Sequence, residues 1–161
     1  MVLPAGYSIS VMNGDEVSVL GGWAAEEGWN PGLADLELAR KIDPDAFIAL
    51  RHGDELAGGG SVFSYDGRFG FMGLFIMRAD LRKQGLGTDL WHWRRDHLLG
   101  RLEAGAGIGM DGVYEMVPFY ERGGFEPAYR DVRYQGTAAG EAHPDVQDLR
   151  PDDFDNIDRY D

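Results

Sequence analysis

Phe71-Met72-Gly73-Leu74-Phe75-Ile76-Met77 is followed, after a short turn, by Arg82-Lys83-Gln84-Gly85-Leu86-Gly87-Thr88. The first stretch is apolar throughout and predicts a buried strand. From Leu86 onward the apolar residues recur at helical spacing, which predicts a helix over residues 86–99. The strand therefore leads directly into the amino-terminal end of a helix.

The turn between that strand and that helix has the residues of an anion site. Gly85 and Gly87 let the backbone approach a ligand closely, and the unbonded N–H groups of a first helical turn point outward as donors. A pyrophosphate suits such donors, and Arg82 and Lys83 add positive charge. The same two glycines also suit a tight strand-to-helix turn that binds nothing. The P-loop and the Gly-x-Gly-x-x-Gly dinucleotide fingerprint are both missing.

The rest of the chain predicts a mixed α/β sheet. Asp66-Gly67 between two apolar runs indicates a two-residue hairpin turn, and Asn13 to Asp15 supply helix-capping chemistry. In the 86–99 helix we expect one face to carry Leu86, Leu90, Trp93 and His97. Strands are expected at residues 7–12, 46–51, 56–65, 68–77, 105–111 and 125–134, and helices at 16–27, 33–41, 86–99 and 113–122.

Composition excludes several classes of protein. The 161 residues include 28 acidic and 15 basic side chains, and the net charge of −13 argues against nucleic-acid binding. An acidic field helps to attract a cationic acceptor, although it also serves solubility alone. There is no cysteine, which excludes disulfides and thiolate sites, and no apolar run long enough for a membrane span. We expect a cytoplasmic protein with no membrane partner.

Two motifs together resemble the GNAT superfamily of N-acetyltransferases. Arg82-x-x-Gly85-x-Gly87 after an apolar strand is similar to its acetyl-CoA motif, and Val117-Pro118-Phe119-Tyr120-Glu121-Arg122-Gly123-Gly124-Phe125 is similar to its late helix. The resemblance implies a GNAT fold, with a mixed, mostly antiparallel sheet of six to seven strands and about four helices. It also implies transfer of an acetyl group from acetyl-CoA to a primary amine of a small molecule or peptide. The alternative is a non-catalytic, regulatory CoA-binding domain of the same fold.

The resemblance also assigns roles at the cofactor end. Backbone groups at the end of the strand are expected to pair with the pantetheine arm, and the turn and helix start are expected to hold the pyrophosphate. The cofactor residues are Phe75, Ile76, Met77, Arg82, Lys83, Gln84, Gly85, Leu86, Gly87 and Thr88.

Tyr120 is the candidate general acid, because its position in the late helix implies a place near the CoA sulfur. Its alternative role is that of a core aromatic residue. Asp111 and Glu115 are weak candidates for the general base, since both also suit a solvated helix start. The family often has Asn where this chain has Val113, so one side-chain contact to the cofactor is in doubt.

The acceptor pocket is expected at the end of the first helix, with Glu26, Glu27, Trp29 and Asn30. Acidic and aromatic side chains suit a cation, although a solvated helix end and a Trp packed on the core also explain them. His92 and His97 are five residues apart, which places them apart around a helix, and no metal is expected.

The carboxy-terminal residues differ from the rest. We expect a GNAT domain over residues 1–140, then a linker and the start of a truncated second GNAT-like domain over residues 141–161. Gly28-Trp29-Asn30-Pro31-Gly32, with Asp111-Gly112-Val113, resembles a bacterial two-domain subgroup. A homodimer is the alternative way to complete the site.

Overall fold

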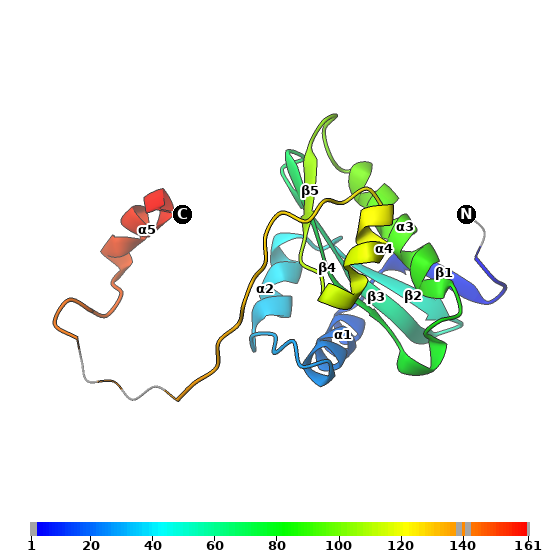
Figure 1. Cartoon of the computed structure of the whole chain (residues 1–161), viewed down its shortest axis with the longest axis horizontal. Coiled ribbons are helices and arrows are strands. Elements are labelled where there is room, and N and C mark those ends of the chain that lie inside the picture. The colour runs from blue at the N-terminus through cyan, green and yellow to red at the C-terminus, as the bar shows by residue number, and fades with distance from the viewer. Residues whose placement is uncertain (1–2, 138–139, 141–142, 161) are drawn as a thin grey trace. The chain divides into compact units, whose positions relative to one another are not determined.

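A computed structural model of the chain describes residues 3–137, 140 and 143–160. It divides into two compact units, Met1–Phe125 and Glu126–Asp161, of which the first contains the sheet. The sheet has the order β1-β2-β3-β4-β5, and its pairs are antiparallel except for the parallel pair β4–β5 (Figure 1). The strands are β1 Tyr7–Val11, β2 Phe47–His52, β3 Glu55–Tyr65, β4 Phe69–Met77 and β5 Gly107–Met110.

Helix α1, Gly14–Glu26, begins at the predicted capping residue. The Asn13 side chain accepts from the Glu16 amide at 3.0 Å, and the Glu16 carboxylate accepts from the Asn13 amide at 2.8 Å. The Glu16 carboxylate also binds Arg51 of β2, with Nε–Oε1 and Nη2–Oε2 distances of 2.5 and 2.6 Å. This ion pair fastens the start of α1 to the sheet. Helix α2, Asp35–Ile42, follows the Pro- and Gly-containing loop.

The predicted hairpin between β3 and β4 is present. Asp66 and Gly67 have φ angles of +50° and +73°, the left-handed values that a two-residue type I′ turn requires at both positions. Tyr65 pairs with Phe69 across the turn, so the register of the two longest strands is set there. The hairpin brings β4 into the sheet with its end directed toward the helix that follows.

Each face of the sheet carries its own core. Strand β2 shows the alternation most clearly, because Phe47 and Ala49 pack with α1 residues while Ile48 and Leu50 pack with α3 residues. All four are buried. The sheet is therefore covered on both faces, by α1 on one and by α3 on the other.

Helix α3, Leu86–Leu99, has the predicted limits but not the predicted buried face. Leu86, Leu90, Arg94 and Leu98 are buried at a spacing of four residues, while Trp93 and His97 are only partly buried. The expectation placed Trp93 and His97 on the buried face, whereas the buried positions are those of Arg94 and Leu98. Arg94 is instead among the largest fully buried side chains of the molecule.

After β5 the chain forms a 3₁₀ turn, Tyr114–Met116, and helix α4, Val117–Arg122, so the helix expected over residues 113–122 is α-helical only from Val117. The α4 aromatics pack on Trp91 of α3, with ring-centroid distances of 5.4 Å to Phe119 and 6.5 Å to Tyr120. Gly123 lies against the same indole, because a Cβ there would overlap the ring. The packing on Trp91 fixes the position of α4.

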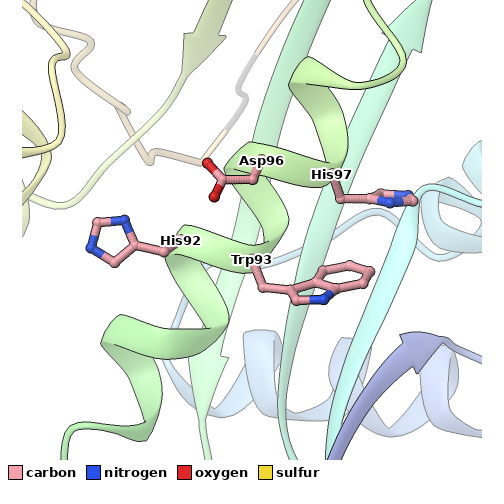
Figure 2. Close-up of a pocket in the computed structure, with 4 residues that line it drawn as sticks. All are labelled: His92, Trp93, Asp96 and His97. Atoms are coloured by element: carbon pink, nitrogen blue, oxygen red, sulfur yellow. The ribbon is translucent and has the colours of Figure 1, made fainter. Parts of the chain in front are cut away.

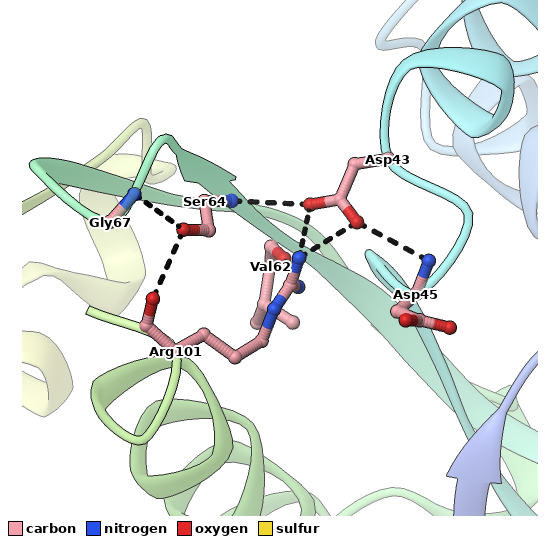
Figure 3. A network of polar contacts seen from close by, with 6 residues as sticks. All are labelled: Asp43, Asp45, Val62, Ser64, Gly67 and Arg101. Carbon is pink, nitrogen blue, oxygen red and sulfur yellow. Dashed lines mark hydrogen bonds and ion pairs between the residues drawn. The ribbon is translucent and has the colours of Figure 1, made fainter.

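A polar network joins the loops at the other end of the sheet (Figure 3). Asp43, after α2, accepts two hydrogen bonds from Nη2 of Arg101, at 2.6 and 2.8 Å. Asp43 also accepts from the amide of Ser64 in β3, and Arg101 donates to the Val62 carbonyl at 2.9 Å. The network therefore joins the loop after α2, strand β3 and the loop after the helix of residues 86–99, at the opposite end of the sheet from Met77.

The second unit corrects two expectations. No strand forms over residues 125–134 in the described part of the chain, so the sheet has five strands rather than six or seven. Alternating residues form a strand only when a neighbouring edge pairs with them, and Pro127 removes one donor from this segment. There are also five α-helices among the described residues rather than four, because residues 154–160 form a further one.

That fifth helix, α5, Phe154–Tyr160, follows a 3₁₀ turn, Pro151–Asp153. It lies within residues 141–161, where a linker and the start of a second domain are expected, and the described residues of this segment contain no strand. Residues 141–142, at the start of the predicted linker, lie outside the described residues. No helix of the described residues has the length and apolarity needed to span a bilayer.

Candidate functional site

Strand β4 contains a bulge at Leu74 and Phe75, which together lie opposite Gly60 of β3. The register against β3 shifts by one residue between the Gly59–Ile76 and Ser61–Gly73 pairs, and Leu74 has a φ angle of +48°. Left-handed backbone is rare for a residue with a side chain and points to a local requirement. The shift turns Leu74 and Ile76 toward the α1 face, although Met72 packs on the α3 face.

Beyond the bulge one edge of β4 is open. The parallel pairing with β5 covers Phe69 to Met72 only and ends at the Met72–Met110 pair. In the described residues no strand pairs with this edge of Gly73 to Met77. This edge of β4 is therefore not covered by another strand at the predicted residues Phe75, Ile76 and Met77, as an added strand or an extended amide ligand would need, although the Met77 carbonyl accepts from Arg82.

The open edge leads into the predicted anion site. Lys83 and Gly85 have φ angles of +63° and +87°, so the chain reverses sharply before α3. Gly85 is the residue before the helix and has no side chain to cap it. A Cβ on Gly87 would lie 3.2 Å from Cγ of Met77, so this glycine allows α3 to pack closely on β4. The sequence predicted these glycines for close approach to a ligand or for a tight turn, and the packing of Gly87 on Met77 was not predicted.

The first turn of α3 also has the expected donors. The amide of Thr88 bonds to the Gly85 carbonyl at 2.9 Å, so the amides of Leu86 and Gly87 precede the first helical bond. The Leu86 side chain is buried, and only its backbone can serve a ligand. The Gln84 side chain is turned back to the Asp80 carbonyl at 3.0 Å. The amides at the start of α3 are thus the groups that a phosphate would need as donors.

Arg82 joins the cofactor residues to the predicted acceptor residues. Its Nε donates to the Met77 carbonyl at 2.9 Å, and its Nη2 forms an ion pair with Glu27 at the end of α1. A cavity of about 240 Å³ lies at this junction. It is lined by Trp23, Glu26, Glu27, Ile76, Met77, Arg78, Ala79 and Arg82.

Two of the four predicted acceptor residues line this cavity and two do not. Glu26 and Glu27 are among its lining residues, whereas Trp29 packs in the α1-side core and Asn30 follows it with a φ angle of +49°. Sequence reasoning missed Trp23, which lines the cavity. The signal that identifies it is its spacing of three from Glu26, which places both on one side of a helix.

Tyr120 is 9% exposed and packs in the α3-side core. A Cβ on Gly112 would lie 2.6 Å from the Tyr120 ring, so Gly112 makes room for the phenol. Burial raises the pKa of Tyr120, and the nearby positive charge of Arg94 acts in the opposite direction. A phenol held protonated in this way is able to donate a proton at neutral pH.

The two candidate bases have weaker support. Asp111 follows β5 and Glu115 lies in the 3₁₀ turn before α4, and both side chains are exposed. Their place in the chain, between β5 and the Tyr120 helix, is the one expected. Nothing in their environment distinguishes either of them as a base.

A larger hollow of about 420 Å³ lies elsewhere, on the outer side of α3, and none of its lining residues was predicted for the site. Figure 2 shows that His92, Trp93, Asp96 and His97 all project from this one helix, with Trp93 and His97 together on one side. The Trp93 and His97 rings are stacked at 4.8 Å. Within the described part of the chain, no cluster of three or more His, Cys, Asp or Glu side chains could hold a metal ion.

A strand with a bulge and an open edge, followed by a glycine turn and a helix, agrees with a comparison with known proteins. The model of the acetyltransferase (GNAT) family matches residues 16–125. The chain belongs to the GNAT acetyltransferase family. Members of this family use acetyl-CoA, and the comparison confirms the class of fold that the two motifs predicted.

The individual proteins that resemble this chain have low sequence identity to it. The holothin acyltransferase of Pseudoalteromonas sp. (strain SANK 73390) is 28% identical over 149 residues, which cover 91% of this chain and 49% of that protein. The chain thus spans about half the length of the curated relative it matches.

Two solved structures share the fold. A proposed acetyltransferase from Pyrococcus horikoshii has a TM-score of 0.66 at 18% identity, with 80% of this chain and 46% of that one covered. The N-acetylglutamate synthase of Neisseria gonorrhoeae, solved with coenzyme A and L-arginine, has a TM-score of 0.59 at 13% identity, with 78% and 28% covered.

Proposed function

We propose that this GNAT domain is an N-acetyltransferase that moves an acetyl group from acetyl-CoA to a primary amine of a small molecule or peptide. The observation that carries the proposal is the open edge of β4 beyond its bulge, which runs into the Gly85 turn and the start of α3. Family membership and the relation to an acyltransferase support it.

The residues present suit the donor. The backbone of Phe75, Ile76 and Met77 would pair with the amides of the pantetheine arm, because that edge of β4 has no strand partner in the described residues. The amides of Leu86 and Gly87 would hold the pyrophosphate, with Lys83 beside them. The Arg82 guanidinium would also bind the pyrophosphate once the phosphate displaces Glu27 from it.

Acetyl-CoA supplies an activated acetyl group, whose carbonyl carbon bonds to the amine nitrogen while the carbon–sulfur bond breaks and its electron pair stays on sulfur. Tyr120 gives its hydroxyl proton to that sulfur and recovers a proton from solvent. The surplus proton of the attacking nitrogen leaves to water or to an exposed carboxylate, Asp111 or Glu115. The products are an amide and a free thiol, and no further reactant is needed.

The cavity between α1 and β4 would take the acceptor. Glu26 and Glu27 give it negative charge and Trp23 gives it an aromatic wall, a combination that favours a cationic amine. The net charge of −13 adds a field of the same sign. We therefore expect amines to be preferred over carboxylate-bearing acceptors.

We further propose that residues 141–161 begin a second GNAT-like domain of a bacterial, cytoplasmic two-domain enzyme, or that a second copy completes the site. The apolar side chains of α5 support this proposal, because Phe154 and Tyr160 are exposed on a short helix. The holothin acyltransferase, of which this chain covers 49%, also supports it.

The donor site is tested by calorimetric titration with acetyl-CoA. Gly85→Glu adds a carboxylate where the pyrophosphate would lie, at a φ angle of +87° that disfavours any side chain. We expect micromolar binding to the wild type and none to this variant. Gly105→Glu is the matched control, because Gly105 has a φ angle of +89°, has open space around it and lies beyond the opposite end of α3. Equal loss in both variants, or no binding to the wild type, would refute the donor site.

A further inference from the structure

Arg94 is a buried cation without a counterion. Its side chain is 1% exposed, and within the described residues no carboxylate forms an ion pair with it. Its Nη2 donates to the Ser61 carbonyl at 2.6 Å and to the Gly73 carbonyl at 2.7 Å. The buried Nε and Nη1 have no hydrogen-bond partner among the described residues. Burying a guanidinium this way is costly, so an apolar side chain would serve packing better.

The surrounding sheet is shaped to fit this side chain. A Cβ on Gly60 of β3 would overlap the guanidinium carbon, so the glycine leaves the space that Arg94 fills. The guanidinium also lies over the Phe75 ring, 5.3 Å from its centroid. Phe75 belongs to the open edge of β4, and Arg94 thus touches the strand predicted to bind the donor.

The contact with Gly73 bears on the bulge. The Gly73 carbonyl belongs to the peptide directly before Leu74, the residue with the left-handed backbone. Nη2 of Arg94 donates to the Ser61 carbonyl of β3 and to the Gly73 carbonyl of β4, and it thereby holds the two strands together at the bulge. Without it, the bulge would lose an acceptor contact that regular pairing does not replace.

Arg94 also acts on Tyr120. Burial lowers the pKa of Arg94, but an arginine starts so high that it stays charged at neutral pH. Burial raises the pKa of Tyr120, and within the described residues the charge that opposes this effect is that of Arg94. When the Tyr120 hydroxyl gives up its proton, a phenolate is left in an apolar core, where a nearby cation stabilises it.

We propose that Arg94 is a positioning residue for acetyl transfer: it holds the β4 bulge through Ser61 and Gly73 and keeps a positive charge beside Tyr120. The proposal rests on the proposed function for its purpose, because it assumes that the edge beyond the bulge binds acetyl-CoA. The proton step is the one given above, in which the O–H bond of Tyr120 breaks and an S–H bond forms.

The binding arm of the test uses acetyl-CoA and the variants Arg94→Met, Arg94→Lys and Leu98→Ala. Methionine keeps the bulk of the side chain but removes its donors and charge, so we expect the Kd for acetyl-CoA to rise by about tenfold or more. Lysine can donate to both carbonyls and should recover much of the affinity. Leu98→Ala is the control, because it removes an equally buried α3 side chain and should lower Tm without changing Kd.

The second arm of the test needs no acetyl-CoA. The titration of Tyr120 is followed by tyrosinate absorbance, as the difference between each protein and its Tyr120→Phe form. Arg94→Met should move the Tyr120 midpoint to higher pH, an effect that a purely structural role would not produce. Wild-type affinity together with an unmoved midpoint in Arg94→Met would overturn the proposal. If Arg94→Met does not fold, the Kd of Arg94→Lys for acetyl-CoA is measured instead. Binding of acetyl-CoA to Arg94→Lys that is no tighter than binding to Gly85→Glu would overturn the proposal.

The two proposals fail in different ways. Absence of acetyl-CoA binding to the wild type refutes the donor site, while the Tyr120 midpoint still reports on Arg94. Wild-type binding that Arg94→Met leaves unchanged refutes the role in the bulge alone.

Discussion

Glu27 and Arg82 form an ion pair between the helix that carries the acceptor residues and the turn that carries the donor residues. Both side chains are partly exposed, so the pair is weak enough for a phosphate to displace it. If acetyl-CoA binds as proposed, its pyrophosphate would displace the Glu27 carboxylate from Arg82 and leave it available to an amine. Donor and acceptor binding would then be linked, with each favouring the other.

Glu27→Gln should therefore tighten acetyl-CoA binding. Loss of a partly exposed ion pair changes Kd by about two- to fivefold. Glu26→Gln removes the same charge from the neighbouring residue, which forms no ion pair among the described residues, and corrects for the general field. Calorimetry on both variants gives the comparison. Weaker binding to Glu27→Gln than to Glu26→Gln would mean instead that Glu27 orients Arg82 toward the phosphate.

Tyr120→Phe should lower turnover by about a hundredfold, the usual contribution of a general acid. The phenylalanine keeps the ring against Trp91 and Gly112, so binding of acetyl-CoA should be unchanged. Turnover is measured as release of free thiol with a panel of primary amines. Equal turnover in Tyr120→Phe and the wild type would leave Tyr120 with only its packing role.

At the scale of elements, Glu16 is both a capping residue and an ion-pair partner of β2. Arg51 is the main cause of the lowered pKa of Glu16, so its stabilising contribution is present above the unfolded value of 4.5 and is lost as pH falls through the lower folded value. Glu16→Gln should lower the free energy of unfolding by about 1–3 kcal/mol at pH 7. Glu37→Gln breaks an exposed ion pair with Lys41 and should have far less effect. Urea unfolding of both variants makes the comparison, and similar losses would contradict it.

Elements with a local signal were predictable. The Asn13 cap and the Asp66-Gly67 turn each depend on residues next to one another in sequence, and the structure contains both. Strand 125–134 failed because a strand depends on an edge that no local pattern reveals. The bulge at Leu74 was also not predictable, since Leu rarely adopts that backbone.

The same distinction applies to the candidate site. The donor residues were identified because glycines and a helix start form a motif along the chain, whereas Arg94 and Trp23 enter through packing between elements. A repeat of four residues through Leu86, Leu90, Arg94 and Leu98 was visible in the sequence. Reading the arginine as part of that apolar stripe would have placed it in the core.

At the scale of the whole molecule, His97 makes stability depend on pH. Burial is the main cause that lowers its pKa, and the Arg101 charge adds to it. The folded state then binds a proton less readily than the unfolded chain, so stability falls as pH drops below the unfolded value of 6.5. Asp43 and Asp45 act against this shift but do not cancel it.

His97→Gln should remove that part of the pH dependence. Urea unfolding at pH 7.5 and pH 5.5 should show a smaller difference for this variant than for the wild type. His143→Gln is a suitable control, because His143 is exposed and lies in the other unit. An unchanged pH dependence in His97→Gln would show that other groups are responsible.

The Trp91 indole has a use that its packing role does not suggest. It is 1% exposed, and Phe119, Tyr120 and Gly123 of the α4 region lie against it. The fluorescence of Trp91 should therefore change when α4 moves away from the indole ring. In a protein whose Trp23, Trp29 and Trp93 are replaced by phenylalanine, the remaining emission would follow the helix that carries Tyr120 in real time, during binding and turnover, without an attached dye.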